Sequence, residues 1–120
     1  MANRIEYAGR KLTIELLCDD DGQCPAAEFL DGLDEGERRK VDVLFEMLGE
    51  NGRIPNREKF KKLEGSSGVF EFKSFQVRLL CFFTPTGRVV ITHGVRKQKN
   101  KHDAHDITYA ERRRKKFLGE

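Results

Sequence analysis

The chain has 120 residues, which is enough for one hydrophobic core and too few for two independent ones. Hydrophobic residues make up 38% of the chain and charged residues 36%, so the composition favours one globular domain over residues 1–120. No apolar run reaches the length of a membrane span or of a signal peptide, which argues against a membrane protein and leads us to expect a cytoplasmic one.

Charge is distributed unevenly along the chain. Residues 1–52 contain 6 Lys and Arg against 13 Asp and Glu, whereas residues 53–120 contain 17 against 7, so the net charges are −7 and +10. Such a basic half favours a polyanionic partner, most simply nucleic acid. The alternative is that the opposite charges of the two halves meet in the folded protein.

The first half predicts a strand followed by two helices. Residues 12–18 alternate and are rich in strand-forming side chains, and an Asp- and Gly-containing turn follows them. Pro25 is suited to the first position of a short helix. Asp34 with Glu37 three residues later is a capping-box pattern, and it predicts the start of a second, amphipathic helix.

The second half predicts a meander of strands and a terminal helix. Residues 69–73 alternate, and two further strands are expected at 76–83 and 88–95, on either side of a turn with Pro and Gly. Residues 59–63 lead into them, so three or four strands are expected. A partial apolar stripe over 103–118 predicts the last helix. The expected fold is α+β, in the order β-α-α-β-β-β-α, with the helices covering one face of an antiparallel sheet.

The cysteines and histidines give little indication of a disulfide or a metal site. The three cysteines are Cys18, Cys24 and Cys81. Because their number is odd and their spacing fits no zinc motif, we expect free thiols. His102 and His105, together with Asp106, are a weak alternative metal site that lacks a further well-spaced ligand. We therefore expect no metal and no other cofactor.

Four short segments of the second half carry a resemblance to a known family. They are Lys62-Leu-Glu-Gly65, Phe70-Glu-Phe-Lys73, Val77-Arg-Leu-Leu-Cys-Phe82 and Thr92-His-Gly-Val-Arg-Lys97. In their order and spacing they resemble the phage-type HigB branch of the RelE/HigB superfamily of bacterial toxins. The resemblance extends over roughly residues 12–118. It implies a RelE-like fold and a metal-independent endoribonuclease that cleaves messenger RNA on the ribosome and is blocked by a cognate antitoxin protein.

The reaction implied by the resemblance needs a phosphate clamp and a proton-transfer group, because the ribose 2′-hydroxyl attacks the adjacent phosphate. Arg78 matches the arginine strand of the family, and a guanidinium can hold phosphate with two hydrogen bonds. His93 is the candidate for proton transfer. Its period-two relation to Ile91 also allows a buried structural role. Arg96 and Lys97 match the cationic segment near the scissile phosphate, and strand parity does not decide between them.

Six further residues are candidates for binding RNA. They are Lys59, Lys61, Lys62, Lys73, Lys99 and Tyr109. The lysines would attract phosphates, and the tyrosine could stack on a base. Each also has an ordinary interpretation, as a solvated cation or as a ring that packs against the sheet.

Two other functions remain open at this point. The same superfamily contains members that inhibit DNA gyrase and cleave nothing. Gln98 stands where the family has a lysine, which also leaves open an inactive protein that only binds nucleic acid.

Overall fold

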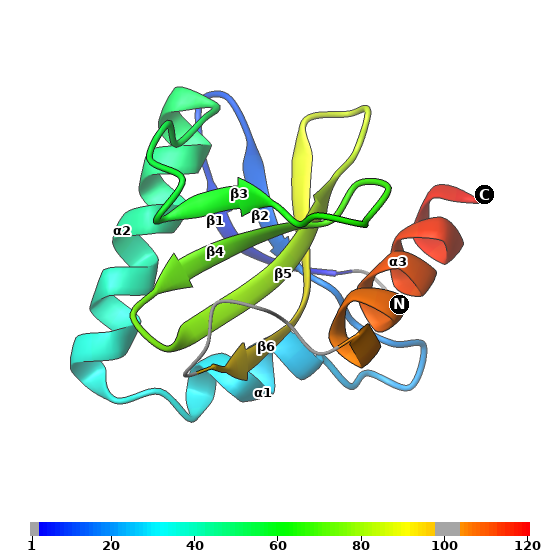
Figure 1. Cartoon of the computed structure of the whole chain (residues 1–120), viewed down its shortest axis with the longest axis horizontal. Coiled ribbons are helices and arrows are strands. Elements are labelled where there is room, and N and C mark those ends of the chain that lie inside the picture. The colour runs from blue at the N-terminus through cyan, green and yellow to red at the C-terminus, as the bar shows by residue number, and fades with distance from the viewer. Residues whose placement is uncertain (1–2, 98–103) are drawn as a thin grey trace.

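The computed structural model describes residues 3–97 and 104–120 (Figure 1). Its elements are β1 (Arg4–Ala8), β2 (Thr13–Leu16), α1 (Pro25–Asp31), α2 (Glu35–Asn51), β3 (Phe60–Lys62), β4 (Phe70–Ser74), β5 (Val77–Phe83), β6 (Arg88–Arg96) and α3 (Ala104–Leu118). The strands form one sheet in the order β1-β2-β6-β5-β4-β3. The expected α+β class is confirmed. No helix in these two ranges is long and apolar enough to cross a membrane.

The sheet is mixed: the expected antiparallel meander of β4, β5 and β6 is confirmed, but the expectation that the whole sheet is antiparallel is wrong. β2 pairs with β6 in parallel, with Leu16 opposite Ile91, while the other neighbouring strands are antiparallel. The chain leaves β2 through two helices and returns through three strands, which brings β6 in between β2 and β5. Periodicity within each strand carries no information about the direction of its neighbour, so this pairing was not predictable from local patterns.

The two N-terminal helices begin where the sequence predicted. Pro25 is the first residue of α1. At α2 the Asp34 carboxylate accepts a hydrogen bond from the Glu37 N–H at 2.8 Å, and the Glu37 carboxylate accepts one from the Asp34 N–H at 3.1 Å. This capping box satisfies donors that would otherwise lack a partner at the helix start.

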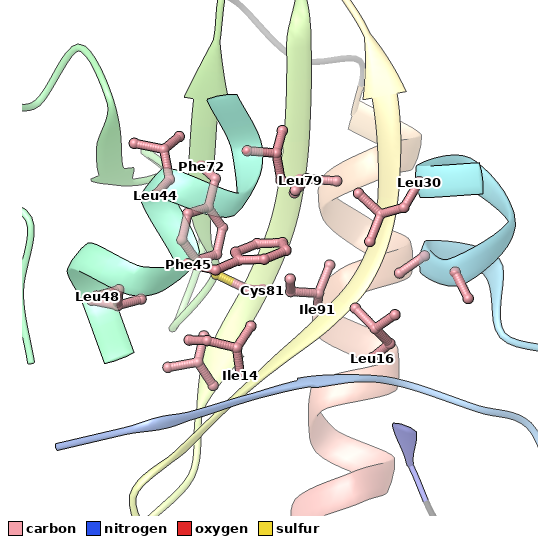
Figure 2. Close-up of a cluster of buried hydrophobic side chains, with 14 of the residues drawn as sticks. Ile14, Leu16, Leu30, Leu44, Phe45, Leu48, Phe72, Leu79, Cys81 and Ile91 are labelled. Atoms are coloured by element: carbon pink, nitrogen blue, oxygen red, sulfur yellow. The ribbon is translucent and has the colours of Figure 1, made fainter. Parts of the chain in front are cut away.

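The main core lies between the sheet and the helices α1 and α2. Figure 2 shows Leu30 of α1 and Phe45 of α2 directed toward the strands, where they meet Phe72, Leu79 and Ile91. All five side chains are almost fully buried. Gly94 of β6 also permits this packing, because a Cβ at that position would lie 2.2 Å from the Phe29 ring of α1.

α3 lies on the opposite face of the sheet, so the expectation that the helices share one face is wrong (Figures 1 and 2). Ala110 of α3 packs with Leu80 of β5, and Phe117 packs with Phe82. The neighbouring Leu79 faces the other helices. Because β5 is apolar on both faces, it can be covered on both.

A β-bulge at Thr92 changes the face of the last residues of β6. Cys81 pairs with Ile91, but Leu80 pairs with His93, so β6 has one extra residue between these pairs. The prediction that Ile91 and His93 share a face is therefore wrong. Ile91 faces the core under α1 and α2, whereas His93 lies on the face covered by α3.

The edge strand β1 was not predicted. It pairs with β2, contains an irregularity between Ile5 and Tyr7, and keeps most of its residues exposed or half-buried. An edge strand of this kind shows little alternation, which explains why the pattern was missed. β3 lies at the other edge of the sheet. It is the short fourth strand of the meander, for which the sequence predicted three or four strands.

Cys18 and Cys24 form a disulfide, which corrects the expectation of free thiols. It closes the loop between β2 and α1, where Cys24 is the N-cap of α1. An odd number of cysteines says nothing about which two meet in space. Cys81 is a free thiol within the core, and burial raises its pKa well above the ordinary value.

Candidate functional site

A cluster of polar side chains lies where the end of β6 meets the first turns of α3. Asp106 of α3 contacts two residues of this region: its Oδ1 is 3.5 Å from His93 Nε2, and its Oδ2 is 3.3 Å from Lys97 Nζ. On the other side of the imidazole, Thr92 Oγ1 is 2.9 Å from His93 Nδ1. The Tyr109 ring meets the His93 ring edge to face, with centroids 4.9 Å apart. The orientation of the imidazole is thus fixed by three neighbours.

The cluster is partly shielded from water and still accessible. The exposed fractions of the side chains are 14% for His93, 19% for Lys97 and 20% for Asp106. Asp106 lies in the first turn of α3, where a carboxylate interacts favourably with the helix dipole. The arrangement combines an imidazole able to move a proton, a carboxylate that orients it, and an ammonium group that can neutralise anionic charge.

Arg113 connects the cluster to the disulfide-closed loop. Its Nη1 donates a hydrogen bond to the Tyr109 hydroxyl at 3.0 Å, and its Nη2 is 2.6 Å from Asp19 Oδ1. A groove of about 720 Å³ runs beside this contact, between residues 18–21 and the second half of α3. The loop after β2 therefore helps to hold the tyrosine against His93.

The structure places Arg96 and Lys97 on opposite sides of the sheet, which the alternation of the strand alone did not decide. Lys97 lies beside Asp106 in the cluster. Arg96 turns to the other side of the sheet and makes two hydrogen bonds to the Glu37 carboxylate, at 2.6 and 2.8 Å. This pairing lowers the pKa of Glu37 to about 2. Arg96 thus ties the end of β6 to the start of α2 and stands apart from His93.

Arg78 shares the face of His93 but has different contacts. It is only 5% exposed. Its Nη1 donates to the backbone carbonyl of Phe75, and also to that of Val77 at 3.1 Å. Its Nε is buried and has no acceptor among the described atoms. Arg78 therefore braces the turn between β4 and β5 and keeps one buried donor that an anionic ligand would satisfy.

The lysines predicted to bind RNA divide between the two faces of the sheet. Lys61 is opposite Glu71, Glu71 is opposite Leu80, and Leu80 is opposite His93, so these residues form one row on the face that α3 covers. Lys73 is in the next row, opposite Arg78, and its Nζ is 3.8 Å from Glu58. This arrangement connects the strand lysines to the face that carries the cluster.

The remaining RNA-binding candidates lie at the edge of the sheet or outside the described residues. Lys59 and Lys62 are exposed, and Lys62, opposite Phe70, points to the other face from Lys61. Lys99 falls outside the residues that the structure describes, as does His102 of the weak metal alternative. Within the described ranges, no three His, Cys, Asp or Glu residues are grouped as metal ligands.

Two residues in or beside the cluster were given no role in it from the sequence. Asp106 was considered only as part of a weak metal site, and Arg113 was not linked to the site. The sequence does indicate that the two residues lie near Tyr109, because Asp106, Tyr109 and Arg113 are spaced i, i+3 and i+7 and so share one side of a helix. Their proximity to His93 depends on the bulge and on the docking of α3, which local patterns do not contain.

Comparison with known proteins identifies the family. No curated protein matches the sequence. The model of a family described as phage-derived protein Gp49-like (DUF891) matches residues 28–115, which include the whole meander and almost all of α3. The chain therefore belongs to the phage-derived Gp49-like family, a RelE/HigB-like family.

Proposed function

We propose that this protein is the toxin of a type II toxin–antitoxin system and an endoribonuclease that cleaves messenger RNA bound to the ribosome. The observation that carries the proposal is the cluster of His93, Lys97, Asp106 and Tyr109 on the α3-covered face of the sheet. Membership of a RelE/HigB-like family supports a toxin in general, and the cluster supports the nuclease.

The chemistry available in the cluster matches cleavage by the ribose 2′-hydroxyl. The 2′-oxygen would attack the adjacent phosphorus, and the bond from phosphorus to the 5′-oxygen would break. The 2′-hydroxyl loses a proton and the leaving 5′-oxygen gains one: His93, held in orientation by Asp106, would carry out one of these two transfers, and solvent water would serve the other. Lys97 would neutralise charge that develops on the phosphate. These side chains act without a metal, and DNA, which lacks the 2′-hydroxyl, would not be cleaved.

Arg78 would contribute to substrate binding on the same face. Its buried Nε lacks an acceptor among the described atoms, and a phosphate oxygen would provide one. Lys61 and Lys73 lie in the rows beside Arg78 and His93, where they would attract the RNA backbone. Lys59, Lys62 and Lys99 would add to this long-range attraction.

The proposal includes a protein partner. A basic active face suggests an acidic antitoxin protein that covers it and blocks access of messenger RNA. Within the superfamily, we propose the HigB-like branch, because the His-Gly segment at His93 and Gly94 resembles the corresponding segment of that branch.

Cleavage of messenger RNA on purified ribosomes tests the proposal. The parent protein should cut the message, and His93→Ala should lower the single-turnover rate by about 10²–10⁴, the usual contribution of a positioned acid or base. Folding of the variant is checked by its thermal melting curve. Val43→Ala serves as the control, because Val43 is exposed on α2 and remote from the cluster in the fold.

Two outcomes would count against the proposal. One is a folded His93→Ala variant that cleaves at the parent rate, which would show that the cluster around His93 is not the site of cleavage. The other is a parent protein that leaves ribosome-bound RNA intact but inhibits DNA supercoiling by gyrase in a parallel assay, which would make it a non-catalytic inhibitor.

A further inference from the structure

Phe75 is an aromatic residue in an unfavourable local position. It is 80% exposed, and it occupies the first position of the two-residue turn between Ser74 and Val77. Its φ is 55°, and no other non-glycine residue in the described ranges has a positive φ. Gly, Asn and Asp are the residues that such turns prefer, and a bulky side chain is strained there. Neither backbone conformation nor burial explains a phenylalanine at this position.

The turn that carries Phe75 is held by two residues of the α3-covered face. The Arg78 guanidinium donates to the Phe75 carbonyl, and the backbone N–H of Lys97 donates to the Gln76 carbonyl at 2.7 Å. The strained conformation is therefore maintained by neighbours that the proposed function involves in RNA binding. An observed backbone outlier that is held in this way is a reason to look for a ligand.

The surroundings of the ring are cationic. Lys40 Nζ of α2 lies 4.3 Å from the ring centroid, and the exposed fraction leaves most of the ring open to solvent. The Arg78 guanidinium contacts the backbone carbonyl of Phe75. Lys97 reaches the turn through its backbone N–H and keeps its ammonium beside Asp106, so Lys40 is the cation placed against the ring itself. An open aromatic ring among cations is complementary to a nucleobase with its phosphates. A protein partner would instead favour an apolar patch, which these neighbours do not supply.

We infer that Phe75 stacks on a base of single-stranded RNA that passes from the cluster around His93 over the β4–β5 turn. The inference rests on the proposed function and extends it with a binding residue. Phe75 lies five residues before Leu80, which is opposite His93, and this separation corresponds to about 16 Å of strand. The stacked base therefore belongs to a nucleotide a few positions from the cleaved bond. Stacking on a ring tolerates any base, so Phe75 anchors the strand without selecting its sequence.

Binding of a short fluorescein-labelled single-stranded RNA, measured at several salt concentrations, tests the inference. Phe75→Ala should raise the Kd roughly 5- to 100-fold, as expected for the loss of one stacked base. The slope of log Kd against log salt should stay unchanged, because stacking releases no counterions, whereas Lys40→Ala should reduce the slope by about 0.7. Val43→Ala, which truncates another exposed apolar side chain, should bind like the parent.

Two further variants separate stacking from stability. The chain has no tryptophan, so Phe75→Trp introduces a single one: this variant should retain its affinity for RNA, and its tryptophan fluorescence should be quenched when an unlabelled RNA binds. Phe75→Asn suits the left-handed backbone better and should melt no lower than the parent, yet lose RNA affinity like Phe75→Ala.

The possible results distinguish this inference from the proposed function. If the parent binds RNA and the folded Phe75→Ala variant binds it equally well, the stacking role is wrong and the proposed function stands. If Phe75→Ala loses only the binding of a co-expressed partner protein, the turn is a protein-binding surface and the inference is again wrong. If the parent binds no RNA at any salt concentration, the inference fails, and cleavage on purified ribosomes then decides the proposed function separately.

Discussion

At the scale of single residues, Asp106 is the side chain that organises the candidate site. One carboxylate contacts both His93 and Lys97, which come from the end of β6, and it does so from the first turn of α3. An imidazole works in proton transfer only when it is correctly oriented toward the reacting group. Asp106 is therefore expected to act by positioning, without itself touching the substrate.

Asp106→Asn should lower the rate of RNA cleavage by about 10²-fold, the effect of a small misplacement of a catalytic group, and leave the Kd for RNA nearly unchanged. Asp106→Glu should restore part of the rate, because it returns the carboxylate at a different distance. The measurement is single-turnover cleavage on ribosomes together with RNA binding.

The matched control for this test is Glu35→Gln. Glu35 is also a carboxylate in the first turn of a helix, but it lies at the start of α2 and is exposed. The Glu35→Gln variant should therefore cleave RNA at the parent rate. An equal loss in both variants, or no loss in Asp106→Asn, would show that the carboxylate has no positioning role.

At the scale of elements, the link between β2 and α1 supports the docking of α3. The Cys18–Cys24 disulfide closes this loop, and Asp19 within the loop pairs with Arg113 of α3. Arg113 in turn donates to the Tyr109 hydroxyl beside His93. A local covalent link near the N-terminus is thus connected to the cluster through two polar contacts.

Reduction of this disulfide should lower the free energy of unfolding by about 2 kcal/mol, the chain-entropy value for so short a loop. Urea unfolding with and without a dithiol reductant measures the difference. The double variant Cys18→Ser, Cys24→Ser should have the same free energy of unfolding as the reduced parent, and the reductant should not change it. Identical unfolding midpoints for the oxidised and reduced parent would contradict this role of the disulfide.

Local elements were predictable from the sequence because their signals are local. The capping box at Asp34 and the proline at the start of α1 specify helix starts through contacts within a few residues. The parallel pairing of β2 with β6 and the Cys18–Cys24 pair join residues by tertiary proximity, and no period in the sequence encodes them.

The candidate site was predictable only in part for the same reason. His93 and Lys97 were identified by residue type and resemblance, but the side of the sheet that they occupy depends on the bulge at Thr92. Without that extra residue, strict alternation assigns His93 to the face of Ile91. The contact of Asp106 with His93 depends in addition on the docking of α3 on the face of the sheet opposite Ile91.

At the scale of the whole molecule, the opposite charges of the two halves meet only in part. Three ion pairs within the described residues connect them: Glu15 with Arg88, Asp19 with Arg113, and Glu37 with Arg96. Lys59 and Lys62 stay exposed at the sheet edge near β3, and Lys115 and Lys116 stay exposed on α3. Both alternatives raised by the charge asymmetry thus describe part of the molecule, and the exposed lysines near β3 belong to the surface that we propose for RNA.

The nature of the cleaved ends tests the central claim most directly, because attack by the 2′-hydroxyl leaves a 2′,3′-cyclic phosphate and a 5′-hydroxyl. Products from ribosome-bound messenger RNA should accept a label from polynucleotide kinase without prior phosphatase treatment. A short free RNA should give the same ends in the presence of a chelator, and a DNA strand of matching sequence should stay intact. Ends that carry a 5′-phosphate, or equal cleavage of the DNA strand, would contradict the account.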